Sequence, residues 1–454
     1  MSKINHDPRI KQAKQLIFDV IDEYQKMFIS GIRPALSEKK ISYQEALDAF
    51  SKLRGGNLFY PYLSSGIGKN GLVMLDDGSI KYDFINGIGA HWGHSSPDII
   101  SANLNAALQD TVMQGNLQQN QSSLSLSKRL CVLSNMDHCF LTTSGAMANE
   151  NALKICFQNR FPAQRILAFE RCFMGRTLAL AQITDTAAYR TGLPPTLSVD
   201  YLPFYDENDH AGSIEKAMNV LNKYLLRYPN DYATMCFELI QGEGGYYSGH
   251  HEFFRSIMAK LKAHNIPILI DEIQTFGRTT SLFATQYFNL EHFVDIITIG
   301  KLSQVCATLY KSHLKPKPGL ISQTFTGSTS AIETSLCILE HLTQGNFLGK
   351  QGQLAQLSEY FIQSLKMLEQ KYPKKIQGPF GIGGMIAFTP LEGNKAIVLQ
   401  ILQRLFKEGV IGFLTGKHPT RIRFLPPFGC ITKDDIDIVV SIIERVVCHG
   451  QYDS

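Results

Sequence analysis

The sequence lacks long apolar runs, closely spaced cysteines and blocks of like charge. No apolar stretch approaches the roughly 20 residues needed to cross a bilayer, and residues 1–22 lack the continuous apolar core of a signal peptide. We therefore expect no membrane segment and a cytoplasmic location. The net charge of +4 is small and dispersed over 454 residues, so we expect no nucleic-acid partner either.

The nine cysteines are scattered, odd in number and never arranged as C-x-x-C. Their spacing predicts neither a disulfide framework nor a zinc site, and reduced thiols in a cytosolic enzyme fit best. His91 and His94 lie near Gly93, but no partner ligands follow at helical or strand spacing. We therefore predict no metal site. The motif G-x-x-x-x-G-K-[ST] does not occur, which argues against a nucleoside-triphosphate site.

The composition is that of a globular protein, with 44% hydrophobic and 19% charged residues, and the length suffices for two or three domains. From about residue 96 to residue 342, strand-like apolar runs alternate with helical patterns, which is typical of a parallel α/β sheet. After about Asn346, a long helix leads to a smaller α+β region, whose last helix opens with the capping pattern Thr432-Lys-Asp-Asp435. The expected strands are 139–143, 165–169, 234–238, 266–271 and 294–299, and the expected helices are 10–28, 148–158, 252–264 and 354–372.

A G-x-G-x-x-G pattern at Gly66 to Gly71 raises the alternative of a dinucleotide-binding oxidoreductase. That motif needs a strand before it, a helix after it and an acidic residue about 20 positions later. Here the apolar run Leu72-Val-Met-Leu75 follows, and then the turn Asp76-Asp-Gly78, which together predict a strand and a hairpin. The context therefore disfavours the oxidoreductase.

Three features instead stand at the ends of predicted strands, where ligands bind in open α/β sheets. Ser144-Gly145-Ala146 joins a strand to a helix, and such a turn offers backbone N–H groups to a phosphate, although many similar turns bind nothing. Asp271 closes an apolar strand, where it could cap a helix or hold a proton on a buried heterocyclic nitrogen. Lys301 follows the next strand, where it could mark a solvent-exposed tip or form a Schiff base. Together the three are the parts that pyridoxal 5′-phosphate requires.

Six stretches then carry a family pattern. They are Ser144-Gly-Ala-Met-Ala-Asn-Glu150, Cys172-Phe-Met-Gly-Arg-Thr177, Glu238-Leu-Ile-Gln-Gly-Glu-Gly-Gly245, Ile270-Asp-Glu-Ile-Gln-Thr-Phe-Gly-Arg278, Thr324-Phe-Thr-Gly327 and Arg421-Ile-Arg-Phe-Leu-Pro-Pro427. With them the chain resembles the class III aminotransferases of the fold type I pyridoxal-phosphate enzymes, from about Asp76 to the last helix. Their counterparts in that family include S-G-A-E-A-N-E, G-F-H-G-R-T, E-P-I-Q-G-E-G-G, F-D-E-V-Q-T-G-x-G-R and T-F-G-G.

The resemblance implies a fold, a cofactor and roles for individual residues. It implies a large domain at 96–345 with a mostly parallel sheet, and a smaller α+β domain built from 1–95 and 346–454. The cofactor is pyridoxal 5′-phosphate. The implied roles are the Schiff base for Lys301, protonation of the ring nitrogen for Asp271, the ring hydroxyl for Gln274, the phosphate for Ser144, Gly145 and Ala146, and the ring face for Phe173. The residue matching Thr324 reaches the phosphate of the neighbouring subunit, which implies a homodimer with shared active sites.

The resemblance also implies a reaction. Arg176 and Arg423 are candidate carboxylate binders, and Glu243 is expected to pair with Arg423 when the reacting end of the substrate carries no carboxylate. The implied activity moves an amino group from an ω-amino acid, such as 4-aminobutyrate, lysine, ornithine or acetylornithine, to 2-oxoglutarate. An aminomutase or a decarboxylase of the same fold stays open as an alternative. Retention of Lys301, Asp271 and both arginines argues against a binding protein that has lost catalysis.

Several positions depart from the family pattern. Met147, Met174 and Leu239 replace an acidic residue, a histidine and a proline. The stretch Leu302-Ser-Gln-Val-Cys306 is nearer to the K-x-x-Q-V-C form of lysine ε-aminotransferases than to the common G-G-G-x-P form. Gly87 stands where ornithine aminotransferases carry a substrate-contacting tyrosine. None of these changes removes a catalytic group, so we expect the chemistry to persist and the substrate pocket to differ.

Overall fold

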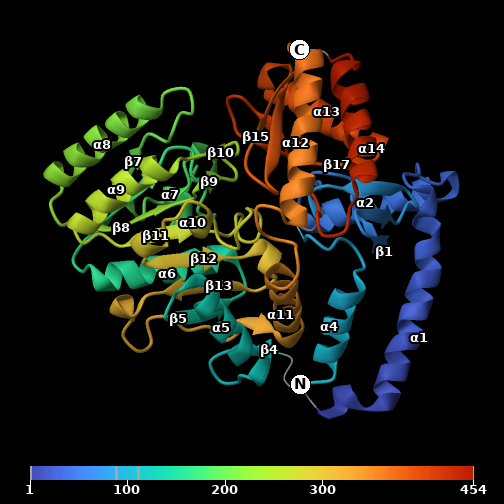
Figure 1. Ribbon diagram of the computed structural model, residues 1–454, viewed down its shortest axis with the longest axis horizontal. Coiled ribbons are helices and arrows are strands. Elements are labelled where there is room, and N and C mark those ends of the chain that lie inside the picture. The colour runs from blue at the N-terminus through green and yellow to red at the C-terminus, as the bar shows by residue number, and fades with distance from the viewer. Residues whose placement is uncertain (1–2, 87–89, 110–112, 453–454) are drawn as a thin grey trace. The chain divides into compact units, whose positions relative to one another are not determined.

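The computed structural model describes residues 3–86, 90–109 and 113–452, and the chain forms two compact units. The central unit comprises residues 102–350, and the terminal unit combines residues 3–101 with those from 351 onward. In Figure 1 the central unit runs from cyan to orange, and the two parts of the terminal unit are blue and orange-red. Gly87, noted above for its place in the family pattern, lies outside the described residues.

Within the described residues, the central unit is built on a seven-stranded sheet. The strand order is β5-β13-β12-β11-β8-β6-β7; β13 runs antiparallel to both of its neighbours, and the other described pairs are parallel. The mostly parallel sheet expected for this region is confirmed. The strands are β5 (His138–Thr142), β6 (Arg165–Phe169), β7 (Ser198–Leu202), β8 (Tyr232–Phe237), β11 (Ile268–Asp271), β12 (Ile296–Ile299) and β13 (Cys306–Tyr310).

The middle strands of this sheet follow from continuous apolar runs. β8, β11, β12 and β13 are buried along their whole length, as expected for a sheet that is covered on both faces. The strand expected at 266–271 begins two residues later, at Ile268, because Pro267 has no N–H to donate to a neighbouring strand. The strand expected at 165–169 has those bounds in the structure.

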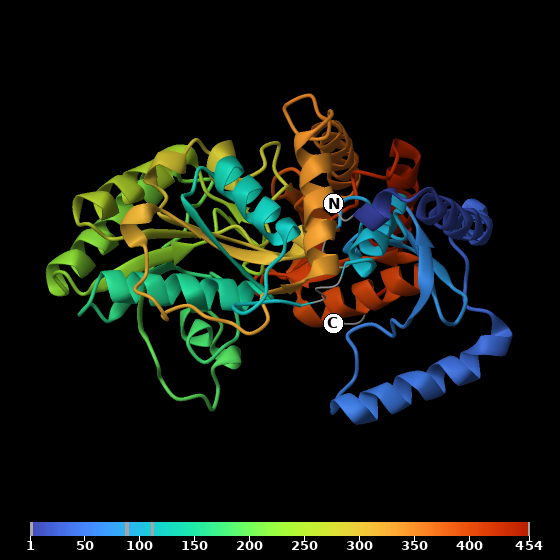
Figure 2. The same ribbon diagram turned by 90° about the horizontal axis from the view of Figure 1, so that it is seen from below.

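Helices cover both faces of the sheet. α6 (Gly145–Asn159) packs against β8, β12 and β13, and α5 (Gln121–Ser134) packs against β5. Figure 2 shows α6 on one face and α5 on the other. α8 (His210–Arg227) packs against α9 (His251–Ala263), and α11 (Thr329–Thr343) packs against α5. The shorter elements are β4 (Met113–Gln114), α7 (Leu180–Ile183), β9 (Ile240–Gln241), β10 (Tyr247–Ser248), α10 (Ala284–Tyr287) and β14 (Gly327–Ser328).

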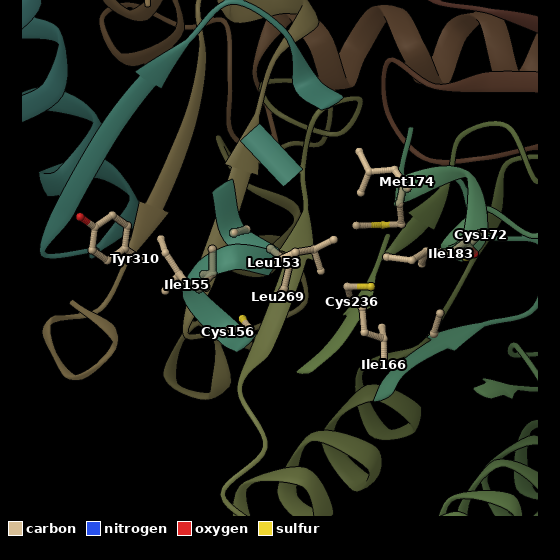
Figure 3. Close-up of a cluster of buried hydrophobic side chains, with 14 of the residues drawn as sticks. Leu153, Ile155, Cys156, Ile166, Cys172, Met174, Ile183, Cys236, Leu269 and Tyr310 are labelled. Atoms are coloured by element: carbon tan, nitrogen blue, oxygen red, sulfur yellow. Dashed lines mark hydrogen bonds between the residues drawn. The ribbon is translucent and has the colours of Figure 1, made fainter. Parts of the chain in front are cut away.

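A buried apolar cluster holds α6 against the sheet (Figure 3). Leu153 of α6 belongs to it together with Ile166 of β6 and Leu269 of β11, and Met174 joins it from the loop after β6. Each such side chain contributes about 1.5–3 kcal/mol when it is removed from water. The cluster therefore fixes the helix, and with it the turn at Ser144, relative to the strands.

The terminal unit contains two four-stranded sheets in its described part, and no helix in the described ranges is both long and apolar enough to cross a membrane. One sheet has the order β1-β2-β3-β17, so strands from both ends of the chain pair within it. The other has the order β15-β16-β19-β18 and is antiparallel. The strands are β1 (Ser64–Lys69), β2 (Leu72–Leu75), β3 (Ile80–Asp83), β15 (Ile376–Phe380), β16 (Ile386–Pro390), β17 (Val410–Ile411), β18 (Phe413–Thr415) and β19 (Arg421–Phe424).

The helices of this unit begin and end close to their expected positions. The helix expected at 354–372 is α12 (Gln353–Lys371), and the capping pattern at Thr432 is confirmed, since Thr432 and Asp435 bond each other's backbone N–H. The remaining helices are α1 (Pro8–Gln25), α2 (Lys40–Arg54), α4 (Pro97–Ala107, which contains the boundary between the units), α13 (Lys395–Glu408) and α14 (Lys433–Ile443).

The G-x-G-x-x-G pattern lies in the β1–β2 hairpin, because Gly66 falls within β1 and β2 begins directly after Gly71. A strand, not a helix, follows the motif. The backbone N–H groups of a helix N-terminus, which a dinucleotide's pyrophosphate would need, are therefore not provided at this point. The structure supports the prediction that this motif does not bind a dinucleotide.

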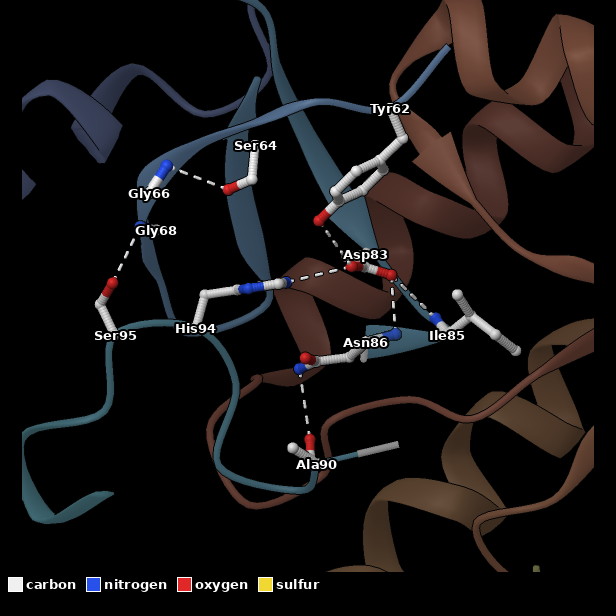
Figure 4. A network of polar contacts seen from close by, with 10 residues as sticks. All are labelled: Tyr62, Ser64, Gly66, Gly68, Asp83, Ile85, Asn86, Ala90, His94 and Ser95. Carbon is white, nitrogen blue, oxygen red and sulfur yellow. Dashed lines mark hydrogen bonds and ion pairs between the residues drawn. The ribbon is translucent and has the colours of Figure 1, made fainter. Parts of the chain in front are cut away.

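β3 ends in a buried polar network (Figure 4). The Asp83 carboxylate, only 2% exposed, accepts hydrogen bonds from the backbone N–H groups of Ile85 and Asn86 at 3.2 and 2.7 Å. Its other oxygen lies 3.1 Å from His94 Nε2 and 3.4 Å from the Tyr62 hydroxyl. Asp83 thus ties the chain that leaves β3 to His94, eleven residues further on.

Candidate active site

The carboxyl ends of β5, β11 and β12 bring three predicted site features to one edge of the central sheet. Parallel strands end at a common edge and lie about 4.8 Å apart. Asp271 of β11 is in register with Thr298 of β12, and Lys301 follows three residues later. Across β13, Cys306 is in register with Thr142, two residues before Ser144. The topology therefore places the three strand ends at the same edge of the sheet.

Lys301 stands directly after β12 in an unusual backbone conformation. Its φ angle is +52°, in the left-handed region that residues with a side chain adopt at a cost of about 1–3 kcal/mol. The preceding Gly300 leaves no room for a side chain, because a Cβ there would lie 2.9 Å from the Cys306 sulfur. Such conformations persist where the surrounding structure holds them, and they cluster at functional sites. Lys301 itself is half-buried.

Asp271 is a buried carboxylate with defined hydrogen-bond donors. Asn149 Nδ2 donates to its Oδ2 at 2.7 Å, and the N–H of Ile273 donates to its Oδ1 at 2.9 Å. Burial raises the pKa of Asp271, whereas these two donors and the charge of Lys301 act in the opposite direction. A protonated ring nitrogen would supply the positive charge that favours the ionised carboxylate here.

The turn at Ser144 is shaped for an anion. Ser144 caps α6, and its Oγ accepts the N–H of Met147 at 3.2 Å, while the N–H groups of Gly145 and Ala146 belong to the first turn of the helix. A Cβ on Gly145 would lie 2.6 Å from Ile273 Cδ1, so the turn approaches Ile273 closely. Ile273 also approaches Gly300, where a Cβ would lie 3.3 Å from its Cγ2. One side chain therefore packs against both the turn and the residue before Lys301.

Two further predicted cofactor contacts are Gln274, three residues after Asp271, and Phe173, on the loop after β6. Gln274 is buried, and a Cβ on Gly242 would lie 2.8 Å from its Oε1, so the turn after β9 packs directly against it. Phe173, half-buried, donates its backbone N–H to Glu238 Oε2 at 2.9 Å. A lysine amine, a buried carboxylate, a helix N-terminal turn and the aromatic ring of Phe173 are the kinds of group that pyridoxal phosphate requires. The residues present therefore fit this cofactor.

Two further residues belong to this arrangement, although no role followed for them from sequence. Glu238 comes directly after β8 and accepts the N–H groups of Phe173 and, at 2.8 Å, of Gly242. Burial, and then the nearby charge of Asp271, raise the pKa of Glu238 to about 8. The second of these residues is Asn149, which orients the carboxylate of Asp271. Both stand in motifs that match the family, and position within a motif is the signal that could have found them.

Arg176 and Glu243 occupy more open positions in the central unit. Arg176 is exposed; its guanidinium lies 4.0 Å from the ring centre of Tyr189 and donates to the Tyr189 hydroxyl at 3.0 Å. Its Cζ lies 6.0 Å from the ring centre of Phe173, and Tyr189 meets Phe173 edge-on at 6.3 Å. Arg176 is thus placed next to the predicted cofactor-stacking ring. Glu243 is half-buried in the turn between β9 and β10.

Thr324 and Arg423 lie on other elements of the chain. Thr324 is exposed on the loop before β14, and its backbone carbonyl packs against Gly115. Arg423 lies on β19 of the terminal unit, where it is 6% exposed and 5.3 Å from the ring centre of Phe413. The predicted pairing of Arg423 with Glu243 joins residues of different units and stays a prediction.

Two of the departures from the family pattern are packing positions. Met174 is buried in the apolar cluster beside Cys172 and Ile183 (Figure 3), and Leu239 is fully buried after β8. Met147 is half-buried in the first turn of α6, where its backbone N–H bonds to Ser144. These side chains replace polar or rigid family residues without displacing Lys301 or Asp271.

This fold and this set of residues define a pyridoxal-phosphate-dependent enzyme. The family model for class III aminotransferases matches residues 62–447, so the chain belongs to the class III aminotransferase family. Its members use pyridoxal phosphate to move amino groups from an amino donor to an oxo acid, and the protein is accordingly a pyridoxal-phosphate-dependent aminotransferase. The predicted family, fold class, enzyme type and cofactor are confirmed.

Several relatives resemble the chain over most of its length. An acetylornithine aminotransferase of Bacillus subtilis is 30% identical, covering 84% of this chain and 94% of that protein. One of Methanocaldococcus jannaschii is 28% identical, covering 83% and 91%. The solved structure of lysine aminotransferase from M. tuberculosis has a TM-score of 0.78 at 20% identity, covering 89% of this chain and all of that one. An ornithine aminotransferase from Toxoplasma gondii has a TM-score of 0.76 at 22% identity, covering 90% and 97%. These structures share the fold.

Proposed function

We propose that this enzyme transfers the amino group of an ω-amino acid to 2-oxoglutarate. The observation that carries the proposal is the placement of Arg176, a guanidinium oriented by Tyr189 within 6.0 Å of the Phe173 ring centre. A guanidinium binds a carboxylate through two parallel hydrogen bonds. A donor held by its carboxylate at Arg176 would present the amine at its other end for reaction. The named activities of the relatives, on acetylornithine, lysine and ornithine, support this donor class.

We assign the catalytic roles in amino transfer to Lys301 and Asp271. When bound, the cofactor draws electrons from the amine-bearing carbon of the substrate into its ring. Lys301 would hold the cofactor through its amine. When it is not holding the cofactor, this amine would be the general base that takes the proton from the donor's amine-bearing carbon. Asp271, which is held by Asn149, would keep the ring nitrogen protonated, and Gln274 would bond the ring hydroxyl.

The two half-reactions place different demands on the substrate site. The donor's reacting carbon has no carboxylate, whereas 2-oxoglutarate carries one next to its oxo group. We assign Arg423 to the second carboxylate and Glu243 to masking Arg423 while the donor is bound. The carboxylate-binding geometry of guanidinium supports this assignment. The same residues would hinder an α-amino group from reacting as long as the pair stays closed.

A panel of donors tests the proposal. The purified enzyme would be mixed in single turnovers with 4-aminobutyrate, lysine, ornithine, acetylornithine and glutamate, and cofactor absorbance would report conversion to the amine form. At least one ω-amino donor should convert the cofactor faster than glutamate does. Release of carbon dioxide, or an isomerised product without net amino transfer, would favour a decarboxylase or an aminomutase instead.

The anchoring role of Lys301 has its own measurement. Borohydride reduction followed by peptide mass spectrometry should add the cofactor's mass to the peptide that contains Lys301. The matched variant Lys301→Arg keeps the charge and should show no such label. Labelling of any other lysine in the unmodified protein would contradict the assignment.

A further inference from the structure

Three metal-ligand side chains meet on the surface of the central unit, at the N-terminal ends of α8 and α9. His210 is the first residue of α8, His250 caps α9, and Glu252 is the second residue of α9. One ligand atom from each lies within 4.8 Å of the other two. Figure 1 shows the two helices side by side. Because 40 residues separate His210 from His250, the cluster exists only in the folded chain.

The geometry is close to that of a three-ligand metal site. His210 Nε2 already lies 2.9 Å from Glu252 Oε2. Zinc binds imidazole nitrogen and carboxylate oxygen at about 2.0–2.2 Å, which places neighbouring ligand atoms about 3.3–3.5 Å apart in a tetrahedron. His250 and Glu252 are exposed, so their side chains can close the remaining gap by rotation. Three protein ligands would leave one position for water.

A second residue, Tyr205, orients the ring of His210. Its Nδ1 lies 3.0 Å from the hydroxyl of Tyr205, while its Nε2 points to Glu252. Metal-binding histidines usually bond a second group through the nitrogen that does not hold the metal, and this bond fixes the ring. Tyr205 is itself packed against Phe253 and stacked on His250, with ring centres 5.6 and 6.0 Å apart. It therefore supports both histidines.

The local charge also favours a cation. Asp206 and Glu207 directly follow Tyr205, whose hydroxyl contacts His210, and Glu252 is a member of the cluster itself. Asp209, the next carboxylate, is paired with Lys216 at 2.8 Å. A divalent cation would offset the negative charge of Asp206, Glu207 and Glu252.

The ordinary alternative is a helix cap with a surface ion pair. The backbone N–H of Glu252 donates to His250 Nδ1 at 3.3 Å, at the long end of the hydrogen-bond range. A metal at either nitrogen of His250 would displace this bond, and its length makes the loss small. The His210–Glu252 pair needs a proton on His210, and a metal would take the place of that proton.

We propose that His210, His250 and Glu252 bind one divalent transition-metal ion of the Zn²⁺, Ni²⁺ or Cu²⁺ class and thereby clamp the start of α8 to the start of α9. The ligand types and their spacing suit these metals, whereas Mg²⁺ and Ca²⁺ prefer sites made of oxygen ligands alone. The proposal does not depend on the amino donor, because none of the three residues belongs to the catalytic group described above.

Calorimetric titration of the tag-free holoenzyme with ZnCl₂ tests the site. We expect a stoichiometry near one ion per chain, and a higher melting temperature of the protein with zinc. His250→Asn keeps a capping side chain but removes the imidazole, and Glu252→Gln keeps an acceptor for His210. Each variant, like His210→Ala, should weaken binding at least tenfold. The matched control His264→Ala removes an exposed histidine at the other end of α9 and should bind as the unmodified protein does.

Copper provides an independent readout. With one equivalent of Cu²⁺, paramagnetic resonance should show coupling to two imidazole nitrogens, and His250→Asn should remove one of them. The donor half-reaction should proceed unchanged in this variant. Absence of stoichiometric binding, or equal binding by the unmodified protein and all three cluster variants, would overturn the proposal.

Discussion

Asn149, in the second turn of α6, donates its side-chain N–H to Asp271 at the end of β11, with 2.7 Å between Nδ2 and Oδ2. The same amide is held from two further sides. Its nitrogen also donates to the carbonyl of Met174 at 2.8 Å, and its oxygen accepts the Thr298 hydroxyl at 2.7 Å. These bonds define which end of the amide faces Asp271. Asn149 therefore acts as a positioning residue for the carboxylate.

Asn149→Ala should weaken cofactor retention without unfolding the protein. A hydrogen bond to a charged group contributes about 1.5–3 kcal/mol, which corresponds to roughly a ten- to hundredfold weaker binding of pyridoxal phosphate. Equilibrium dialysis with cofactor absorbance would measure the change. Asn151→Ala, which removes another buried asparagine of α6, is the matched control. Equal cofactor retention by Asn149→Ala and the unmodified protein would show that Asp271 needs no support from Asn149.

Arg176→Lys should raise the KM for ω-amino donors by about tenfold and change kcat less. Lysine keeps the charge but loses the planar fork that binds a carboxylate at two points. The matched control is Arg171→Lys, because Arg171 is also exposed and lies over a tyrosine, with its guanidinium 4.9 Å from the Tyr247 ring centre. Steady-state kinetics with each donor would measure both constants. A similar change in the two variants would remove Arg176 from the substrate site.

Thr324→Ala tests the proposed sharing of active sites between two subunits. Thr324 and the neighbouring Phe325 are exposed in the single chain, as a contact with a partner would require. The variant should lose cofactor more readily while the protein stays dimeric in size-exclusion chromatography with light scattering. Ser322→Ala, on the same exposed loop, controls for loss of a hydroxyl. A fully active monomer at working concentration would refute the shared site.

The reactive strand ends could be predicted because each is a local pattern. An apolar run that ends in Asp271, or in glycine and then Lys301, is visible in a window of ten residues. The contact between Asn149 and Asp271 is not local, since 122 residues separate the two and Asn149 alone is an ordinary helical residue. Tyr189 ends a 3-10 helix of only three residues, which is too short to give a periodic pattern, so its bond to Arg176 is not visible in the sequence.

The cluster of His210, His250 and Glu252 is likewise a contact between residues far apart in the sequence. No ligands stand at helical or strand spacing from His91 and His94, and the expectation of no metal site followed from this and from the scattered cysteines. His210 has no other histidine near it in the sequence, and His250, next to His251 and Glu252, follows only 40 residues later. Packing of α8 against α9 brings them together, and α8 also packs against β7.

Glu238→Gln should alter how stability depends on pH. Glutamate has a pKa near 4.5 when exposed, and burial raises the pKa of Glu238 to about 8 in the folded state. Between these values the folded protein binds the proton more tightly than the unfolded chain does. The stabilisation is therefore fully present below pH 4.5 and is lost as the pH rises to about 8. The slope is at most about 1.4 kcal/mol per pH unit.

Glutamine resembles the protonated acid and has no charge to bury, so Glu238→Gln should remove this slope. Melting temperatures measured from pH 5.5 to 8.5 should show the unmodified protein losing stability relative to the variant as the pH rises. At low pH the protonated acid and the amide each keep one carbonyl oxygen for the N–H groups of Phe173 and Gly242, and the amide nitrogen cannot accept the second N–H, which adds a difference in stability that is constant with pH. Glu369→Gln removes a carboxylate that accepts the N–H of Gly378 in the terminal unit, and it should keep the slope of the unmodified protein. If the difference between the unmodified protein and Glu238→Gln stayed constant across this range, Glu238 would not be the buried proton-binding group.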